Sequence, residues 1–234
     1  QILNDAATGV ARYAENMIRA LLSLKSRHSF VLFGGALFAG PGIRIVPTSS
    51  IVDTSASRIL WEQFVLPGKA RAEGVDLMYY PDHTAPLLVK HCKIVITIHD
   101  LAFLSMPETH RPARRMYKSM TFRRSVGQSD KIIADSDSTQ RECVNQAGIP
   151  KGQIVVVHCG VDPSMHREHD AKILSAVKKK YGLKDRFILY VGTLERRKNL
   201  VRLIHSFARL KKNGSMRHQL VLVGGRGYGY EEIL

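Results

Sequence analysis

The sequence is short of cysteine, of aromatic residues and of long apolar segments. Cys92, Cys143 and Cys159 are the only cysteines among 234 residues, and none has the CxxC spacing of a metal-binding pair. An odd, sparse set of this kind is typical of reduced thiols in a cytoplasmic protein. The longest apolar runs, such as Ile94–Ile98, are strand-sized, whereas a membrane-spanning helix needs about 20 apolar residues.

Acidic residues are also scarce, since 20 Asp and Glu stand against 35 Lys and Arg and give a formal net charge of +15. Such a surface attracts polyanions, which include nucleic acids, anionic lipids and phosphorylated substrates. The alternative is a basic surface that only keeps the protein in solution. Aromatic residues make up 7% of the chain, too few to interleave with the basic ones as a nucleic-acid binder requires. We therefore predict no nucleic-acid partner.

Short apolar runs alternate with segments of helical periodicity along the whole chain. Most of the runs are rich in β-branched or aromatic residues and end in Gly, Pro, Asp or Ser, as buried strands do. The expected strands are Phe30–Phe33, Ile43–Val46, Val75–Tyr79, Ile94–Ile98, Lys131–Ala134, Ile154–Val157, Phe187–Val191 and Leu220–Val223. The expected helices are Val10–Leu22, Ile59–Ala72, Arg114–Val126, Ser138–Ala147, Ala171–Tyr181 and Leu200–Leu210. This alternation predicts βαβ units, a parallel sheet and a doubly wound α/β fold.

The chain divides near Pro163 into two strand–helix series. Residues 1–163 are assigned to an N-terminal Rossmann-like domain whose first strand is missing, because the series opens on a helix. Residues 164–185 form a linker and a lysine-rich helix, and residues 186–234 begin a second domain. Its two strands bury too little surface for a finished domain. We therefore expect a fragment truncated at both ends, which also lacks an initiator Met and a signal peptide.

Two candidate sites lie in the first half, where ligands of such sheets bind beyond the carboxyl ends of the strands. Gly9 opens the first helix, whose free N–H groups and dipole suit a phosphate; a plain helix start is the alternative. His99 and Asp100 follow the most apolar strand, where His can donate to a sugar hydroxyl or exchange a proton and Asp can accept. The alternative is a structural histidine beside a helix-capping aspartate.

The second half offers a basic loop after the strand at 187–191. Gly192 and Thr193 are followed by Arg197 and Lys198 at the entrance to a helix, where these cations can grip a diphosphate. A solvated charge run is the alternative. A glycine-rich loop at 224–229 occupies the same place after the next strand, and it matches neither GxGxxG nor the P-loop pattern.

A formal DxD motif, Asp135-Ser136-Asp137, lies at a strand-to-helix junction. Asp and Ser are favoured caps of helices at such junctions, so we interpret it as a cap rather than as a metal site. No metal ligands are expected elsewhere in the sequence. A GxSxG nucleophile elbow is also missing.

Seven collinear segments resemble the family 4, or group 1, retaining glycosyltransferases of the GT-B fold. They are TGVARYAENMIRALL (8–22), RILWEQFVLPGKARAEGVDLMYYP (58–81), VITIHDLAFLSMPE (95–108), IIADSDSTQRECV (132–144), IVVVHCGVD (154–162), YVGTLERRKNLVRLIHSFARLK (190–211) and LVLVGGRGYGYEEI (220–233). The GTLE and RKN residues and the WEQ segment look most like bacterial mannosyltransferases of polysaccharide assembly.

The resemblance implies two Rossmann-like domains, the first for the acceptor and the second for a nucleotide-sugar, expected to be GDP-mannose. Gly9 would lie by the diphosphate and the transferred sugar, with His99 near the reacting centre and Asp100 beside it. Arg197 and Lys198 would neutralise the leaving diphosphate, with Gly192 and Thr193 in the same donor site. Retention of anomeric configuration, a cytoplasmic location and no need for a metal or other cofactor follow from the same resemblance.

The chain departs from the family pattern at three places. Arg196 stands where a proline is usual, and Thr193 stands where many members have an arginine. The third departure is a segment with two glutamates that hold the ribose and sugar of the donor, which has no counterpart before Leu234. We therefore predict that the chain alone does not catalyse and that the full-length parent does.

One helical stretch carries basic residues without any acidic one. Arg111, Arg114, Arg115 and Lys118 lie in it beside Met116, and this pattern is typical of a surface for anionic lipid. A lipid-linked or saccharide acceptor and a place at the inner membrane face would fit it; a helix packed on the sheet with a solvated basic side is the alternative. Two other functions stay open, a GT-B nucleotide-sugar epimerase and a basic nucleic-acid binder.

Overall fold

The computed structural model of the protein describes residues 9–24, 26–34, 42–48, 55–87, 89, 91–109, 112–162 and 164–234, with the side chains of residues 55, 56, 113 and 114 left aside. The chain forms two compact units. One consists of Gln1–Ser105 and Ala113–Gly160, and the other consists of Met106–Pro112 and Val161–Leu234. The domain limits expected at residues 163 and 185 remain predictions, because Pro163 is not among the described residues.

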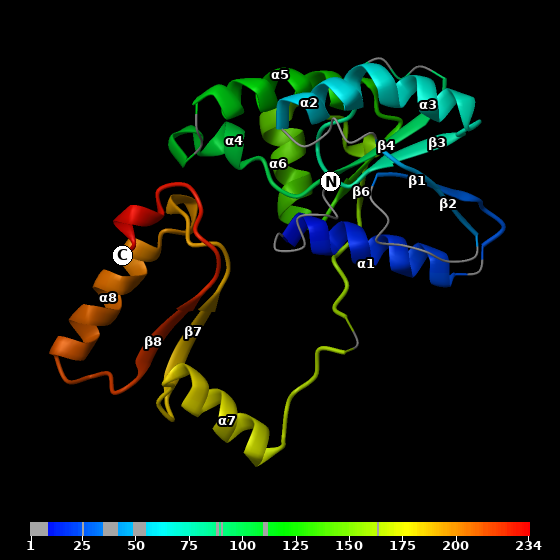
Figure 1. The fold of residues 1–234 in the computed structure, drawn as a ribbon. Coiled ribbons are helices and arrows are strands. Elements are labelled where there is room, and N and C mark those ends of the chain that lie inside the picture. The colour runs from blue at the N-terminus through cyan, green and yellow to red at the C-terminus, as the bar shows by residue number, and fades with distance from the viewer. Residues whose placement is uncertain are drawn as a thin grey trace. The chain divides into compact units, whose positions relative to one another are not determined.

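The first unit is built on a parallel sheet of four strands (Figure 1). Their order is β3 (Leu77–Tyr80), β4 (Lys93–Ile98), β5 (Lys131–Ala134) and β6 (Ile154–Val156). A separate parallel pair is formed by β1 (Phe30–Phe33) and β2 (Ile43–Val46). The register aligns Ile98 with Ala134, so the residues that follow β4 and β5 emerge side by side.

Helices connect these strands, as the predicted βαβ units require. They are α1 (Gly9–Ser23), α2 (Ser55–Leu60), α3 (Leu66–Ala72), α4 (Ala102–Ser105), α5 (Pro112–Gln128) and α6 (Asp137–Ala147). Short 3-10 turns occur at η2 (Pro107–Thr109) and η3 (Lys151–Gln153). The helix expected at 59–72 is interrupted by a π-helical stretch, η1 (Trp61–Val65). Pro67 follows it, and a proline without an N–H cannot hold the regular α-helical ladder there.

The buried core of the first unit lies on this sheet. Ile96, Ile98 and Ile132 have no exposed surface, and Trp61 is packed into the same cluster. Strands this apolar must be covered on both faces, which is the arrangement of parallel sheets in α/β proteins. The core therefore fixes the strand ends at which the polar site residues emerge.

The second unit contains a parallel pair, β7 (Phe187–Val191) and β8 (Gln219–Val223), with α7 (Ala171–Tyr181) and α8 (Leu200–Lys212). Two 3-10 turns, η4 (Arg196–Lys198) and η5 (Tyr230–Glu232), follow the strands. Much of the apolar surface of this pair is open, since Leu189 is 52% and Val191 71% exposed.

The mixed α/β fold with parallel sheets confirms the predicted fold class. All eight expected strands are present, with ends that differ by at most two residues. The four-residue helix α4 was not predicted, because one helical turn leaves no periodic pattern in a sequence.

Candidate functional site

His99 lies at the carboxyl end of β4 and is held through both ring nitrogens. Its Nδ1 is 3.2 Å from Oδ2 of Asp135, and its Nε2 is 3.0 Å from the carbonyl oxygen of Pro81. The ring of Tyr13 meets the imidazole edge-on, with 4.7 Å between the centroids. The imidazole therefore joins the strand ends of β3, β4 and β5 to the first helix.

Three hydroxyl groups form a cluster beside His99. The Tyr79 hydroxyl donates to that of Tyr13 at 3.2 Å and lies 2.9 Å from Oγ1 of Thr97, which is fully buried. Burial raises the pKa of Tyr79, so its hydroxyl keeps its proton and remains a donor. The sequence assigned no role to any of the three, although Tyr13 and Thr97 lie in the segments that hold Gly9 and His99 and Tyr79 ends an expected strand.

Asp135 contacts His99 and does not cap the helix that follows it. Ser136 is the actual cap of α6, because its Oγ accepts from the backbone N of Thr139 at 3.1 Å. Asp135 instead turns one carboxylate oxygen to His99 and accepts from Oγ1 of Thr139 with the other, at 3.0 Å. Its place directly after β5, next to the strand that precedes His99, was the available signal.

The other two site residues of the first unit have simpler surroundings. Asp100 is exposed, and its Oδ1 accepts from the backbone N of Ala102 at the start of α4, which is the capping geometry named as the alternative. Gly9 is the first residue of α1, and no atom of the described residues lies within 4 Å of the place where its Cβ would be. Tyr13 stands one turn further along this helix, so Gly9 belongs to the same end of the unit as His99.

In the second unit, the basic loop and the glycine-rich loop lie against each other. The N of Leu194 donates to the carbonyl of Gly225 and the N of Gly227 to that of Leu194, both at 2.8 Å. A Cβ on Gly224 would stand 1.9 Å from the carbonyl oxygen of Gly192, which itself has a φ of +154°. The two motifs are thus one structure, a parallel ladder continued past the ends of β7 and β8.

Arg197 and Lys198 differ in how firmly they are held. The Arg197 guanidinium contacts Oε1 of Glu195 through Nε at 3.1 Å and through a terminal nitrogen at 2.8 Å. Lys198 is exposed, and so is Thr193. A fixed planar guanidinium beside an exposed ammonium suits an oxyanion ligand with several oxygens, such as a diphosphate.

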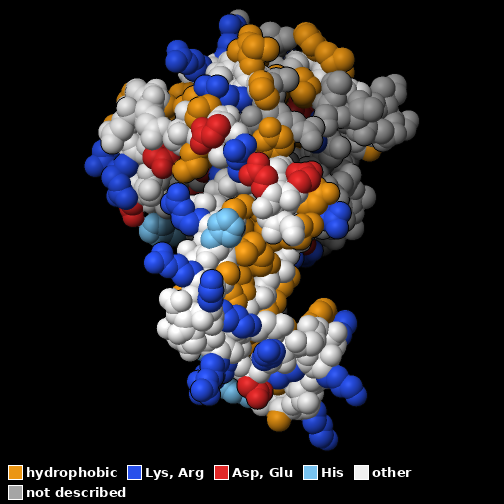
Figure 2. All heavy atoms as spheres, turned by 90° about the vertical axis from the view of Figure 1, so that its left-hand side faces the viewer, with side chains coloured by type: hydrophobic (Ala, Val, Ile, Leu, Met, Phe, Trp, Pro, Cys, Tyr) orange, Lys and Arg blue, Asp and Glu red, His pale blue; other side chains and the backbone are white. Residues whose placement is uncertain are grey.

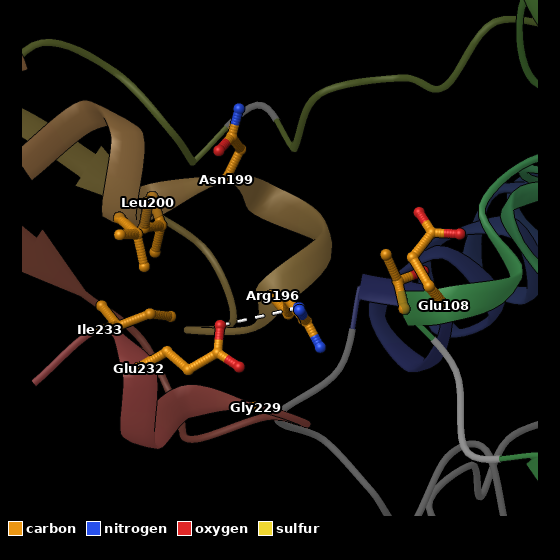
Figure 3. A pocket seen from close by; sticks show the side chains of 9 residues that line it. Glu108, Arg196, Asn199, Leu200, Gly229, Glu232 and Ile233 are labelled. Atoms are coloured by element: carbon orange, nitrogen blue, oxygen red, sulfur yellow. Dashed lines mark ion pairs between the residues drawn. The ribbon is translucent and has the colours of Figure 1, made fainter.

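A hollow in this unit adjoins the basic loop (Figure 3). Arg196 and Glu232 point toward each other across it, with 3.6 Å between Nε and Oε2. Leu200 and Ile233 form its apolar side and are 2% and 7% exposed. Arg196, which replaces the usual proline, thus ties η4 to η5.

The predicted lipid-binding helix is only partly described. Arg111 and the side chain of Arg114 are outside the described residues, and Arg115 is exposed on α5. Lys118 is half-buried, with Nζ 5.9 Å from the Phe103 ring centroid. Met116 and Met120 are 65% and 70% exposed. The Lys118 side chain is therefore directed toward the core, whereas Met116, Met120 and Arg115 are exposed to solvent.

No helix in the described ranges is both long and apolar enough to cross a membrane. No group of three His, Cys, Asp or Glu that could hold a metal ion occurs among the side chains that the structure describes.

Comparison with family models decides the classification. Residues 7–165 match the model for Glycosyltransferase Family 4, and residues 174–233 match that for Glycosyl transferases group 1. The chain belongs to glycosyltransferase family 4. This membership favours the transferase over the epimerase and the nucleic-acid binder that the sequence left open.

Curated relatives of this glycosyltransferase chain include two mannosyltransferases of Escherichia coli. It is 25% identical to O-antigen chain mannosyltransferase B over 94% of its own length and 61% of that protein. It is 30% identical to serotype-specific mannosyltransferase WbdA over 56% of its length and 16% of that protein. The glycosyltransferase chain thus spans less than two thirds of either relative.

Solved structures share the GT-B fold of this glycosyltransferase chain. A glycosyltransferase from Rickettsia africae aligns with a TM-score of 0.56 and 15% identity, over 93% of this chain and 57% of the other. HepE from Anabaena, in complex with UDP and glucose, aligns with a TM-score of 0.53 and 20% identity, over 82% and 50%. These similarities confirm the expected architecture.

Proposed function

We propose that the protein transfers mannose from GDP-mannose to a lipid-linked or saccharide acceptor in polysaccharide or glycolipid synthesis. The observation that carries this proposal is the polar cluster around His99 at the strand ends of a family 4 chain. The names of both E. coli relatives support the mannosyl group. HepE binds UDP and glucose, so a uridine nucleotide is the main competing donor.

In the proposed reaction, the bond between the anomeric carbon and the diphosphate breaks and a bond to an acceptor oxygen forms. The acceptor hydroxyl passes its proton to the departing diphosphate or to water, and the nucleoside diphosphate leaves with the remaining negative charge. Arg197 and Lys198 stabilise that charge; no metal or other cofactor is needed for it. Nε2 of His99 accepts a hydrogen bond from a hydroxyl of the transferred sugar, and the anomeric configuration is retained.

A turnover assay tests this function. The chain, alone and extended to the natural stop codon of its reading frame, is incubated with GDP-, UDP- and dTDP-sugars, a membrane-lipid extract and EDTA. We expect the extended protein to release GDP from GDP-mannose only when acceptor is present. Proton NMR of the product gives the anomeric configuration. If no nucleoside diphosphate is released from any of the sugar donors, the proposal is wrong. If release is greatest from a UDP-sugar, the donor is that UDP-sugar and not GDP-mannose.

Two lysine variants test whether Lys198 belongs to the donor site. Lys198→Ala should lower kcat about 100-fold or more, as removal of one charge-stabilising group does. Lys184→Ala removes an exposed lysine of the same unit and is the matched control. Equal rates for the two variants would exclude Lys198 from the donor site.

We also propose that α5 brings the enzyme to the cytoplasmic face of an anionic membrane, where a lipid-linked acceptor lies. Met116 and Met120 are exposed on a helix that also exposes Arg115, Arg123 and Arg124. Lys and Arg side chains are spread over the face shown in Figure 2, with hydrophobic side chains among them. Apolar contact combined with positive charge favours interfacial binding to anionic lipid.

Vesicle sedimentation tests the membrane proposal. Binding to vesicles with phosphatidylglycerol should exceed binding to pure phosphatidylcholine, and it should fall as salt rises. Met120→Asp should weaken it, whereas Met165→Asp, at a residue 60% exposed in the second unit, should not. Equal binding to both vesicle types would show that α5 does not bind anionic lipid and that its basic side is only solvated.

A further inference from the structure

The two polar neighbours of the His99 ring differ in charge. Its partner on Nδ1 is a carboxylate and its partner on Nε2 is a backbone carbonyl, at 3.2 Å and 3.0 Å. An anion beside Nδ1 favours the proton on that nitrogen, which fixes the tautomer and the rotation of the ring. With the proton on Nδ1, Nε2 of the neutral ring is an acceptor, so the carbonyl oxygen of Pro81 is a neighbour that a hydroxyl donor can replace. Asp135 is thus the stronger of the two restraints.

Asp135 is itself held in place. Its Oδ1 accepts from Oγ1 of Thr139, a residue only 5% exposed in the first turn of α6. Its backbone directly follows β5, whose last residue is in register with Ile98. The side chains of His99 and Asp135 are 18% and 21% exposed, so both sit at the rim of the unit. Both side chains are therefore partly accessible, and the hydrogen bond from Thr139 restrains Asp135.

We propose that Asp135 is a positioning residue, which holds the Nδ1–H of His99 so that Nε2 meets a hydroxyl of the transferred sugar. The sugar hydroxyl then donates to Nε2 and displaces the contact with the carbonyl of Pro81, and the bond to Asp135 is kept. This inference rests on the proposed sugar transfer. It assigns a role in the reaction to a residue that is not required as a helix cap, because Ser136 caps α6.

Nitrogen NMR of the histidine rings tests the pairing without any turnover. In the 234-residue chain labelled at its ten histidines, the His99 signals are assigned through His99→Gln. We expect Asp135→Asn to move the Nδ1 and Nε2 signals of His99. Asp137→Asn is the matched control, because the Asp137 carboxylate lies 3.5 Å from Nε2 of His158 and should move only that ring. Unchanged His99 signals in Asp135→Asn would overturn the proposal.

Turnover of the extended protein tests the role in the reaction. By analogy with carboxylates that orient metal-binding histidines, Asp135→Asn should lower kcat about 10- to 100-fold, with a smaller change in the KM of the donor. In a His99→Gln background the same change should have little further effect, because the two residues act as one unit. If Asp135 only supported the fold, the kcat of the double variant would be lowered by the product of the two single-variant factors.

The outcomes separate this inference from the proposed function. A normal kcat in Asp135→Asn with altered ring signals refutes the positioning role and leaves the transferase intact. Multiplying losses in the double variant refute it as well. If the wild-type protein transfers no sugar from any donor, the proposed function is wrong. The NMR signals alone then decide whether Asp135 is hydrogen-bonded to the His99 ring.

Discussion

At the scale of single residues, the three cysteines differ in burial and therefore in reactivity. Cys143 has no exposed surface, and burial raises its pKa to about 12, so almost no thiolate exists at pH 8. Cys159 is exposed and Cys92 is partly buried. A thiol reagent at pH 8 should modify Cys159 first and Cys143 only after urea is added. Mass spectrometry of the modified peptides checks this order, and early labelling of Cys143 would contradict its burial.

Asn199 adopts a backbone conformation that few side chains tolerate. Its φ is +53° at the junction between η4 and α8, in the left-handed region where Gly and Asn are the least strained residues. Asn199→Val should therefore destabilise the second unit by about 1–2 kcal/mol, whereas Asn199→Gly should change its stability little. Urea unfolding followed by circular dichroism compares the two. Equal midpoints would show that the turn relaxes.

A site residue could be predicted from the sequence only where its position suggested a single role. His99 follows the most apolar of the expected strands, so its position alone singled it out. Asp135 stands beside Ser136 at a helix start, where capping accounts for an aspartate equally well. Only the register of β4 with β5 shows that its carboxylate meets His99 instead. That contact joins residues 36 positions apart, and no local pattern encodes it.

At the scale of elements, the close approach of two loops depends on glycine. A Cβ on Gly224 would lie 1.9 Å from the carbonyl oxygen of Gly192, whereas nothing lies within 4 Å of one on Gly225. Gly224→Ala should therefore push the loops apart and weaken nucleotide binding, and Gly225→Ala should not. Calorimetric titration of the extended protein with GDP measures this difference. Similar affinities would show that the loop pair does not shape the donor site.

The predictability of the elements follows from their local patterns. The strands were predictable because runs of four or five mostly apolar residues, rich in β-branched or aromatic side chains and bounded by turn residues, are typical of buried strands. The π-helical stretch Trp61–Val65 was not, because its periodicity differs little from that of the flanking helix. The pairing of the loops at 192–196 and 224–228 was also hidden, since it depends on the parallel register of β7 with β8.

At the scale of the whole molecule, hydrophobic burial is divided unequally. The core cluster consists of residues of the first unit, from Trp61 to Ile154. In residues 164–234, all of which are described, only Leu200 and Ile233 are buried hydrophobic residues. Because stability grows with the apolar area that is buried, we expect the first unit to be the more stable of the two.

Urea unfolding can resolve the two units, because the only tryptophan, Trp61, belongs to the core of the first. Its fluorescence should change at a higher urea concentration than the circular dichroism signal, to which the helices of both units contribute. Leu200→Ala, a buried truncation worth about 2–5 kcal/mol, should lower only the early transition seen by circular dichroism. Ile132→Ala should instead lower the fluorescence midpoint. If the two signals coincide in the wild type and both variants shift them together, the units unfold as one cooperative body.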